Sequence, residues 1–508
     1  MSCEAGTGLN ACDPGMGPYS DGRRVLRIGL TKKEIWKMRR CVCFVCLLVL
    51  IGCRGQKNKK EARKEEDVNQ DSSQREEPTY TDYGPEAGRG PESRTATRPR
   101  GVLARPTRRQ IEFMDLELGM FIHFGLNTFT GQQHGDGKEP PSRFEPANLD
   151  CDQWARVAKS MGARYVVFTA RHEGGFCLWP TKTTDYSVRN SPWKGGKGDL
   201  VREFVDACRK YDLKVGLYHS SSFDAHHRKV LRMGDKDFLE VQLAQLTELL
   251  TNYGPIEYMW FDHHGGGEFW EAVDKTVARL QPDCLRFGPD VWITGGHTGV
   301  AEEVLWCAVD TATGRISDRP TTVDGEPWGQ YFRVWEANTT GNGRWFWHDE
   351  ETPTAAPLAE LLEKYDNSVG RGANLLLNFA PDPRGQMPDD VVARAKEFGD
   401  EIRRRFARPI AEAAGKGNVV TIDLTRPTVI DQVVVMEDLA GGQRIAEHCI
   451  EALVSGQWRQ VAAGRTVGHK RIYTIEPVAA AQVRFRCSKS IVEPVEIRNL
   501  AVYQVGKD

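Results

Sequence analysis

The chain lacks an excess of charge of either sign. Its 68 Lys and Arg residues nearly balance its 70 Asp and Glu residues, and the formal net charge is −2 over 508 residues. Proteins that bind nucleic acid rely on Lys and Arg contacts to phosphates and usually carry a strongly positive surface. We therefore expect no nucleic-acid partner. A chain of this length is expected to form two or three domains.

Motifs that hold metals or phosphate groups are also missing. The seven cysteines beyond residue 53 include no C-x-x-C pair, which argues against a zinc ribbon or a redox dithiol. Asp262-His263-His264 and His226-His227 are candidate metal ligands. Adjacent residues at a strand end point in opposite directions, however, and no helical His pair at i, i+4 accompanies them. The sequence therefore predicts neither a metal nor a cofactor.

The only marked apolar run near the N-terminus is too short to cross a bilayer. Residues 41–51 are apolar and follow Met38-Arg39-Arg40, as in a secretory signal. The run ends in Leu50-Ile51-Gly52-Cys53, which resembles the lipobox of bacterial lipoproteins. We predict an exported lipoprotein that Cys53 attaches to a membrane, in the periplasm or at the cell surface. An uncleaved anchor is the alternative, and Met38 is an alternative start.

Large apolar residues are almost absent between the signal and residue 107. This segment is rich first in Lys, Glu, Gln and Arg and then in Gly, Pro and Thr, so it cannot bury a core and is expected to be a disordered tether. We therefore divide the chain into an N-terminal extension with signal (1–53), a linker (54–107), a large folded domain (108–408) and a C-terminal domain (409–508).

From residue 111 onward, short β-rich runs alternate with amphipathic helical runs. Strands are predicted at 119–125, 164–170, 214–220, 256–262, 284–290, 332–336 and 374–380, and helices at 152–161, 200–211, 236–252, 269–280 and 358–369. Asp199 is placed to cap the second helix. This alternation predicts an α/β fold, a (β/α)8 TIM-type barrel. A doubly wound open sheet is less suitable, because no Gly-rich loop follows the first strand. The alternating short strands of 409–508 predict a small β-sandwich.

Titratable residues recur where the predicted strands end. In a TIM-type barrel the chemistry takes place at the C-terminal ends of the strands. The residues at those ends are His123, Arg171-His172-Glu173, His219, Asp262-His263-His264, Asp290 and Trp335-Glu336. Ten of the 12 histidines lie between His123 and His348. This recurrence predicts an active site at one rim, where tryptophans would suit the apolar faces of sugar rings.

Several segments near this rim resemble a known family. They are FIHFGLNTFT at 121–130, FCLWPT at 176–181, TDYSV at 184–188, WFD at 260–262 and NLLLN at 374–378. These segments resemble the exo-α-L-fucosidases of glycoside hydrolase family 29, most of all the branch that acts on α-1,3/1,4-linked fucose. The resemblance covers roughly residues 108–405 and extends into the C-terminal domain. It implies a retaining glycosidase that releases terminal α-L-fucose, or a closely related sugar, from glycans.

The resemblance implies roles for individual residues. Asp262 corresponds to the nucleophile of a double displacement, which requires an ionised carboxylate and an acid about 5–5.5 Å away. His123 and His172 correspond to residues that hold the fucose hydroxyls. The remaining candidates for substrate binding are His134, Glu173, His219 and Trp335.

The resemblance fails at the proton donor. Residues 288–297 align with the family segment that ends in the acid/base Glu, and this alignment puts His297 at its position. Histidine can deliver a proton near neutral pH, since its unperturbed pKa is ~6.5, so His297 is a candidate substitute. A carboxylate from a neighbouring loop, Glu173 or the pair Glu302-Glu303, is the alternative. A third reading is a barrel with altered or lost activity that acts as a glycan-binding surface protein.

Overall fold

The computed structural model describes residues 102–265, 267–309, 325–348 and 355–506. The signal segment, Cys53 and almost all of the expected linker lie outside these residues, so export and lipidation stay predictions. Among the described residues, no helix is both long enough and apolar enough to cross a membrane.

Eight parallel strands form the central sheet, in the order β5-β4-β3-β2-β1-β10-β9-β6. They are β1 (Leu118–Ile122), β2 (Tyr165–Arg171), β3 (Lys214–His219), β4 (Tyr258–Trp260), β5 (Leu285–Arg286), β6 (Val291–Ile293), β9 (Val334–Thr340) and β10 (Asn374–Asn378). A bridge between Phe287 and Val291 links the two end strands, so the sheet is almost closed. The predicted TIM-type barrel is confirmed.

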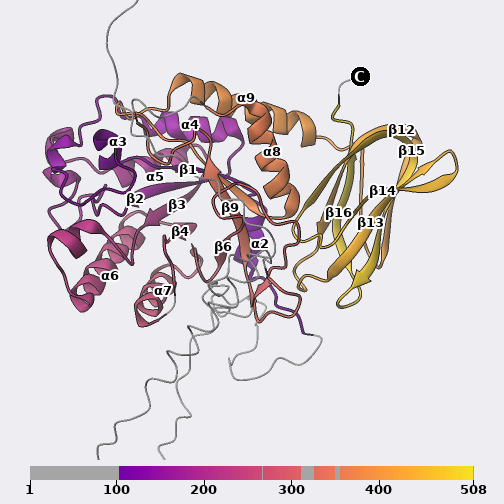
Figure 1. Cartoon of the computed structure of the whole chain (residues 1–508), viewed down its shortest axis with the longest axis horizontal. Helices are drawn as coiled ribbons and strands as arrows, with labels where there is room; N and C mark the ends of the chain where they lie inside the picture. The colour runs from indigo at the N-terminus through magenta and orange to yellow at the C-terminus, as the bar shows by residue number, and fades with distance from the viewer. Residues whose placement is uncertain (1–101, 266, 310–324, 349–354, 507–508) are drawn as a thin grey trace, which may run out of the picture. The chain divides into compact units, whose positions relative to one another are not determined.

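Helices surround the strands as an outer layer (Figure 1). They include α4 (Cys151–Met161), α5 (Leu200–Lys210), α6 (Asp235–Asn252), α7 (Glu268–Leu280), α8 (Leu358–Ser368) and α9 (Asp389–Phe406). The first five agree with the predicted helices to within one residue at each end, and α9 was not predicted. The Asp199 carboxylate caps α5 as expected, since it accepts a hydrogen bond of 2.9 Å from the Arg202 backbone N–H.

Both faces of the barrel strands are apolar, because one face fills the barrel and the other packs against the helices. Along β1 and β4, Phe121 and Trp260 belong to the inner core, whereas Met120 and Met259 belong to the outer one. This alternation follows from the two-residue period of a strand. The short helix α2 (Arg108–Met114) contributes Phe113 to the inner core and covers the N-terminal end of the barrel.

Two of the predicted strands were misplaced. The predicted strand 332–336 was too early, because β9 runs over Val334–Thr340. The predicted strand 284–290 combined β5 with the turn before β6. In that turn the buried Asp290 carboxylate accepts a 2.8 Å bond from Arg286 Nε, so this carboxylate stabilises the turn and is not presented at the rim.

The C-terminal domain is a β-sandwich built from one antiparallel sheet, in the order β11-β16-β12-β15-β13-β14. Its strands are β11 (Ala411–Lys416), β12 (Val419–Glu437), β13 (Ile445–Val454), β14 (Gln457–Gly464), β15 (Arg471–Ser490) and β16 (Glu496–Tyr503). The pairing of β12 with β15 shifts register at two places, where the long strands bend around a separate apolar core. The predicted sandwich is confirmed.

Candidate active site

A cavity of about 200 Å³ opens at the C-terminal ends of the barrel strands. Its polar lining includes five histidines and two carboxylates, which are His123, His134, His172, His263, His297, Asp262 and Glu173. Six of the eight residues predicted for catalysis or substrate binding therefore meet in one place, although they come from loops far apart in the sequence.

Asp262 lies just beyond β4 and is held by two donors. The Tyr218 hydroxyl donates a hydrogen bond of 2.9 Å to Oδ2, and the backbone N–H of His263 donates one of 3.0 Å to Oδ1. About 28% of the Asp262 side chain is exposed, so the oriented carboxylate remains open to a ligand. This is the arrangement that a carboxylate nucleophile requires.

His123 follows β1 and is held in one tautomer. Its Nδ1 lies 2.7 Å from the side-chain oxygen of Asn378, whose amide nitrogen donates to the backbone oxygens of Arg344 and Trp345. Nδ1 therefore carries the proton, and Nε2 is left as an acceptor. Burial holds the pKa of His123 well below its usual value, so the ring is neutral near pH 7.

His172 follows β2 and is also neutral. Its ring stacks on Tyr218 with centroids 5.3 Å apart. Burial lowers the pKa of His172 to about 4. Neutral imidazoles can donate or accept a hydrogen bond, which suits them to neutral hydroxyl groups such as those of a sugar.

Glu173 is held between two histidines. Its Oε2 lies 2.7 Å from Nδ1 of His134, and its Oε1 lies 2.8 Å from Nε2 of His263. The hydrogen bond from His263 is the main reason that the pKa of Glu173 falls to about 2, with His172 and His134 adding to it. Glu173 is therefore ionised at neutral pH and has no proton to give.

His297 lies in the loop after β6. Its Nδ1 faces the side-chain oxygen of Asn338 at 2.5 Å, and its ring meets Trp345 edge-on at 5.6 Å. Glu302 and Glu303, the other sequence candidates for the acid, are not among the residues that line the cavity.

Aromatic rings form the cavity floor. Trp260 stacks on Tyr218 at 5.4 Å and on Phe287 at 4.3 Å, and its indole N–H donates a 2.9 Å bond to the buried carboxyl of Glu336. Burial raises the pKa of Glu336 to about 7. The floor is therefore a packed aromatic surface whose indole N–H is bonded inside the barrel, which suits the apolar face of a sugar.

His219 and Trp335 do not reach this cavity, and their predicted contact with the substrate has to be corrected. His219 is fully buried on the outer face of β3, where its Nδ1 lies 2.7 Å from Ser221 Oγ. Trp335 is 1% exposed near the start of β9, far from the rim end, and its N–H donates to the Trp306 carbonyl. The error for His219 arose because side chains alternate between the two faces of a strand, and this one points outward. The error for Trp335 arose because the predicted strand began and ended too early.

Residues of the site that were not predicted include Tyr218, Asn338 and Asn378, and His263 was expected at the rim but without a role in binding or catalysis. Tyr218 could have been found, because it precedes His219 and so must point to the opposite face, into the barrel. The roles of Asn338 and Asn378 depend on contacts with residues far away in the sequence, which no local pattern reveals.

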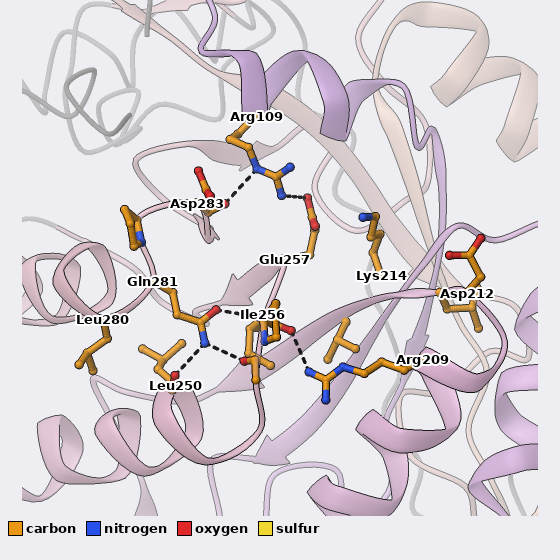
Figure 2. A pocket seen from close by; sticks show the side chains of 15 residues that line it. Arg109, Arg209, Asp212, Lys214, Leu250, Ile256, Glu257, Leu280, Gln281 and Asp283 are labelled. Carbon is orange, nitrogen blue, oxygen red and sulfur yellow. Dashed lines mark hydrogen bonds and ion pairs between the residues drawn. The ribbon is translucent and has the colours of Figure 1, made fainter. Parts of the chain in front are cut away.

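A larger cavity of about 660 Å³ lies at the opposite end of the barrel (Figure 2). Several of its polar groups already have partners within the protein. Arg109 forms an ion pair with Glu257, and the Gln281 side chain bridges the Ile256 backbone N–H and the Leu250 carbonyl at 2.7 Å each. The smaller cavity is therefore the candidate active site, because there the strand ends bring an open carboxylate and histidines together.

One group in the smaller cavity has the composition of a metal site. One ligand-type atom each from Glu173, Asp262 and His263 lies within 4.8 Å of the others. These three side chains also take part in the hydrogen bonds that link Glu173 to His263 and Asp262 to Tyr218. The sequence-based expectation of no metal stays a prediction.

Comparisons with known proteins identify the family of this chain. Residues 132–404 match the family model described as alpha-L-fucosidase. Alpha-L-fucosidase 1 of Arabidopsis thaliana is 32% identical over 456 residues, covering 80% of this chain and 88% of the plant protein.

Solved structures similar to this chain also belong to glycoside hydrolase family 29. A glycoside hydrolase 29 family member from an unknown rumen bacterium is 34% identical, with a TM-score of 0.73 over 80% of this chain and 78% of that one. A Ruminococcus gnavus family 29 fucosidase, solved in complex with fucose, is 25% identical, with a TM-score of 0.71 over 82% of this chain and 99% of that one. The chain therefore belongs to the alpha-L-fucosidase family of glycosidases, glycoside hydrolase family 29.

Proposed function

We propose that this protein is an exo-acting retaining α-L-fucosidase with Asp262 as its nucleophile. The observation that carries the proposal is the oriented, partly exposed Asp262 carboxylate at the rim of the barrel. The cavity of about 200 Å³ is smaller than the ~300–1,000 Å³ typical of drug-sized ligands, which suits a single terminal sugar.

The residues of the cavity support a two-step reaction. In the first step the Asp262 carboxylate forms a bond to the anomeric carbon while the bond to the leaving oxygen breaks and that oxygen takes up a proton. In the second step, water attacks the same carbon and frees Asp262. Tyr218 keeps the carboxylate oriented, and the neutral rings of His123 and His172 face the sugar hydroxyls.

The first step also requires a group that gives a proton to the leaving oxygen. The two carboxylates in the cavity are the nucleophile and Glu173, and the histidines around Glu173 hold its pKa at about 2. His297 is the candidate from sequence alignment, and it does line the cavity. Among the described residues that line the cavity, none is a carboxylic acid free to donate, which also supports a second candidate function, a barrel that binds fucosylated glycans without cleaving them.

Substitution of Asp262 tests the main proposal. We expect Asp262→Gly to reduce turnover of an aryl α-L-fucoside by at least ~10³-fold, because the covalent step is lost. Azide should restore turnover and give a fucosyl azide of inverted configuration, since the small anion can occupy the space of the carboxylate. Asp206→Asn, on the exposed face of α5, is the control and should behave as wild type.

Two results would contradict the proposal. Asp262→Gly turning over the substrate at the wild-type rate would exclude Asp262 as the nucleophile. A wild-type protein that binds a fucosylated glycan in calorimetry, yet hydrolyses no aryl glycoside, would establish the binding function instead.

A further inference from the structure

His263 has an unusual place beside the nucleophile. It directly follows Asp262, lines the cavity, and adopts a positive φ of 55°, a conformation that is uncommon for residues other than glycine. Strained backbone of this kind is often kept where it serves a function. About 62% of the side chain is exposed, so the ring lies at the mouth of the cavity, where a leaving group departs.

The ring of His263 is coupled to both carboxylates of the site. Its Nε2 lies 2.8 Å from Glu173 Oε1 and 3.9 Å from Asp262 Oδ1. Because Nε2–H donates to Glu173, Nδ1 is the nitrogen that can exchange a proton with a substrate. Glu173 is itself fixed, since His134 binds its second oxygen at 2.7 Å.

An imidazole that donates a proton must first hold it. A carboxylate in hydrogen-bonding contact stabilises the imidazolium form, whereas a neutral amide does so much less. His263 has the carboxylate of Glu173 as its partner, and His297 has the side-chain oxygen of Asn338. The hydrogen bond to Glu173 raises the pKa of His263. The titratable groups that face the His263–Glu173 pair are Asp262, His134 and His172.

We propose that His263, paired with Glu173, is the acid/base group that protonates the departing oxygen in this chain. The inference rests on the proposed fucosidase function. It assigns the role of the family's acid/base carboxylate to a residue on the loop after β4, rather than to His297 on the loop after β6.

The proton transfers balance in both steps. As the bond between the anomeric carbon and the leaving oxygen breaks, the Nδ1 proton of the His263 imidazolium moves to that oxygen, and Asp262 bonds to the carbon. Glu173 stays ionised throughout. In the second step, Nδ1 of the neutral ring takes a proton from the attacking water, whose oxygen bonds to the carbon as the bond to Asp262 breaks. The imidazolium is then restored.

The test compares His263→Gly with His297→Gln on aryl α-L-fucosides of graded leaving-group acidity. Glycine tolerates the positive φ, so His263→Gly should fold as wild type, which its circular dichroism and melting temperature would verify. We expect this variant to keep turnover of the dinitrophenyl substrate within about tenfold and to lose at least ~10²-fold on the unsubstituted phenyl fucoside. Azide should accelerate it and give a fucosyl azide of retained configuration.

His297→Gln is expected to lose similar activity on all the substrates, as for a group that binds the sugar. A steep leaving-group dependence in His297→Gln, with none in His263→Gly, would overturn the inference and establish His297 as the donor, leaving the fucosidase function intact. An unchanged phenyl fucoside rate in His263→Gly would overturn it as well. A wild-type protein inactive on every aryl fucoside would refute the proposed function together with the inference.

Discussion

The carboxylate of Glu173 shows how one side chain can act through its neighbours. It is not able to donate a proton itself, because His263 and His134 hold its pKa at about 2. Its effect on catalysis would instead come from the hydrogen bond that raises the pKa of His263. The sequence identified Glu173 as a site residue but not this role, which depends on a turn at Asp262 that folds His263 back toward β2.

Glu173→Gln should therefore change the pH profile rather than abolish activity. Loss of the anion lowers the pKa of His263, and the protonated ring is the form that assists departure. The basic limb of kcat/KM on the phenyl fucoside should thus move to lower pH. Glu302→Gln, which lies outside the cavity, is the matched control. A basic limb at the wild-type position in Glu173→Gln would contradict the coupling.

The position of a site residue could be predicted from the sequence where the residue directly follows a strongly apolar strand. It could not be predicted where the position depends on a contact with a residue far away in the chain. Asp262, His123 and His172 come directly after buried strands, and the structure brings them together. His219 was wrong because an error of one residue in parity puts a side chain on the other face of the sheet. Trp335 was wrong because an error of a few residues in the strand bounds leaves its side chain inside the barrel but far from the rim.

At the level of secondary structure, predictions succeeded where the apolar pattern is strong. The predicted helices have wide apolar faces and were placed to within a residue. The helix α9 was missed because its buried positions, such as Val391, Ala395 and Phe398, form a narrow stripe among many charged residues. The strands β5 and β6 contain two and three residues, too few to show a period of their own.

Gly399, inside α9, marks a close contact with α4. A Cβ atom built at this position would lie 2.1 Å from the Ser160 carbonyl oxygen and 2.7 Å from the Met161 carbonyl carbon. These are backbone atoms at the end of α4 and cannot rotate away. The glycine therefore allows α9 to pack against the barrel at this distance.

Gly399→Ala should consequently destabilise the protein, although alanine normally favours a helix by about 1 kcal/mol over glycine. We expect a net loss of about 1–3 kcal/mol in the free energy of unfolding by urea, as for an overpacked core. Ala393→Gly, at an exposed position of the same helix, should cost about 1 kcal/mol through propensity alone. A Gly399→Ala protein more stable than wild type would contradict this prediction, because it would mean that α9 can move away from α4 without loss of packing.

At the scale of the whole described molecule, polar contacts join the barrel to the β-sandwich. Gln443 accepts a 2.9 Å bond from the Cys307 backbone N–H and donates a 2.8 Å bond to the Leu305 carbonyl. Arg498 pairs with Asp115 at 2.7 Å, and Lys470 pairs with Glu117. The order of domains could be predicted from the sequence. These contacts could not, since they join residues more than a hundred positions apart.

The Glu117 ion pair should make this junction sensitive to acid. Burial opposes ionisation, but Lys470 and His469 lower the pKa of Glu117 to about 2, below the ~4.3 of an unfolded chain. The resulting stability, on the order of 2 kcal/mol, is present above the unfolded pKa and is lost as the pH falls toward 2.

Glu117→Gln should therefore be less stable than wild type at pH 6 in urea unfolding, and the difference should shrink as the pH is lowered toward 2. Glu240→Gln, an exposed change on α6, should differ from wild type by less than about 0.5 kcal/mol throughout. A difference for Glu117→Gln that stays constant with pH would mean that the carboxylate does not titrate as described.

The incomplete closure of the barrel bears on how this protein can diversify. In the described part of the chain, β6 has a full ladder with β9 and only a single bridge toward β5. The loop that carries His297 begins at this seam, with Gly295, Gly296 and Gly299 at positive φ. Replacements in the loop disturb few strand contacts, whereas the turn at Asp262–His263 follows a strand paired on both sides. Changes in the loop after β6, outside Gly295 and Gly299, whose positions leave no room for a Cβ atom, are therefore expected to cost less folding stability than changes at the turn that holds Asp262.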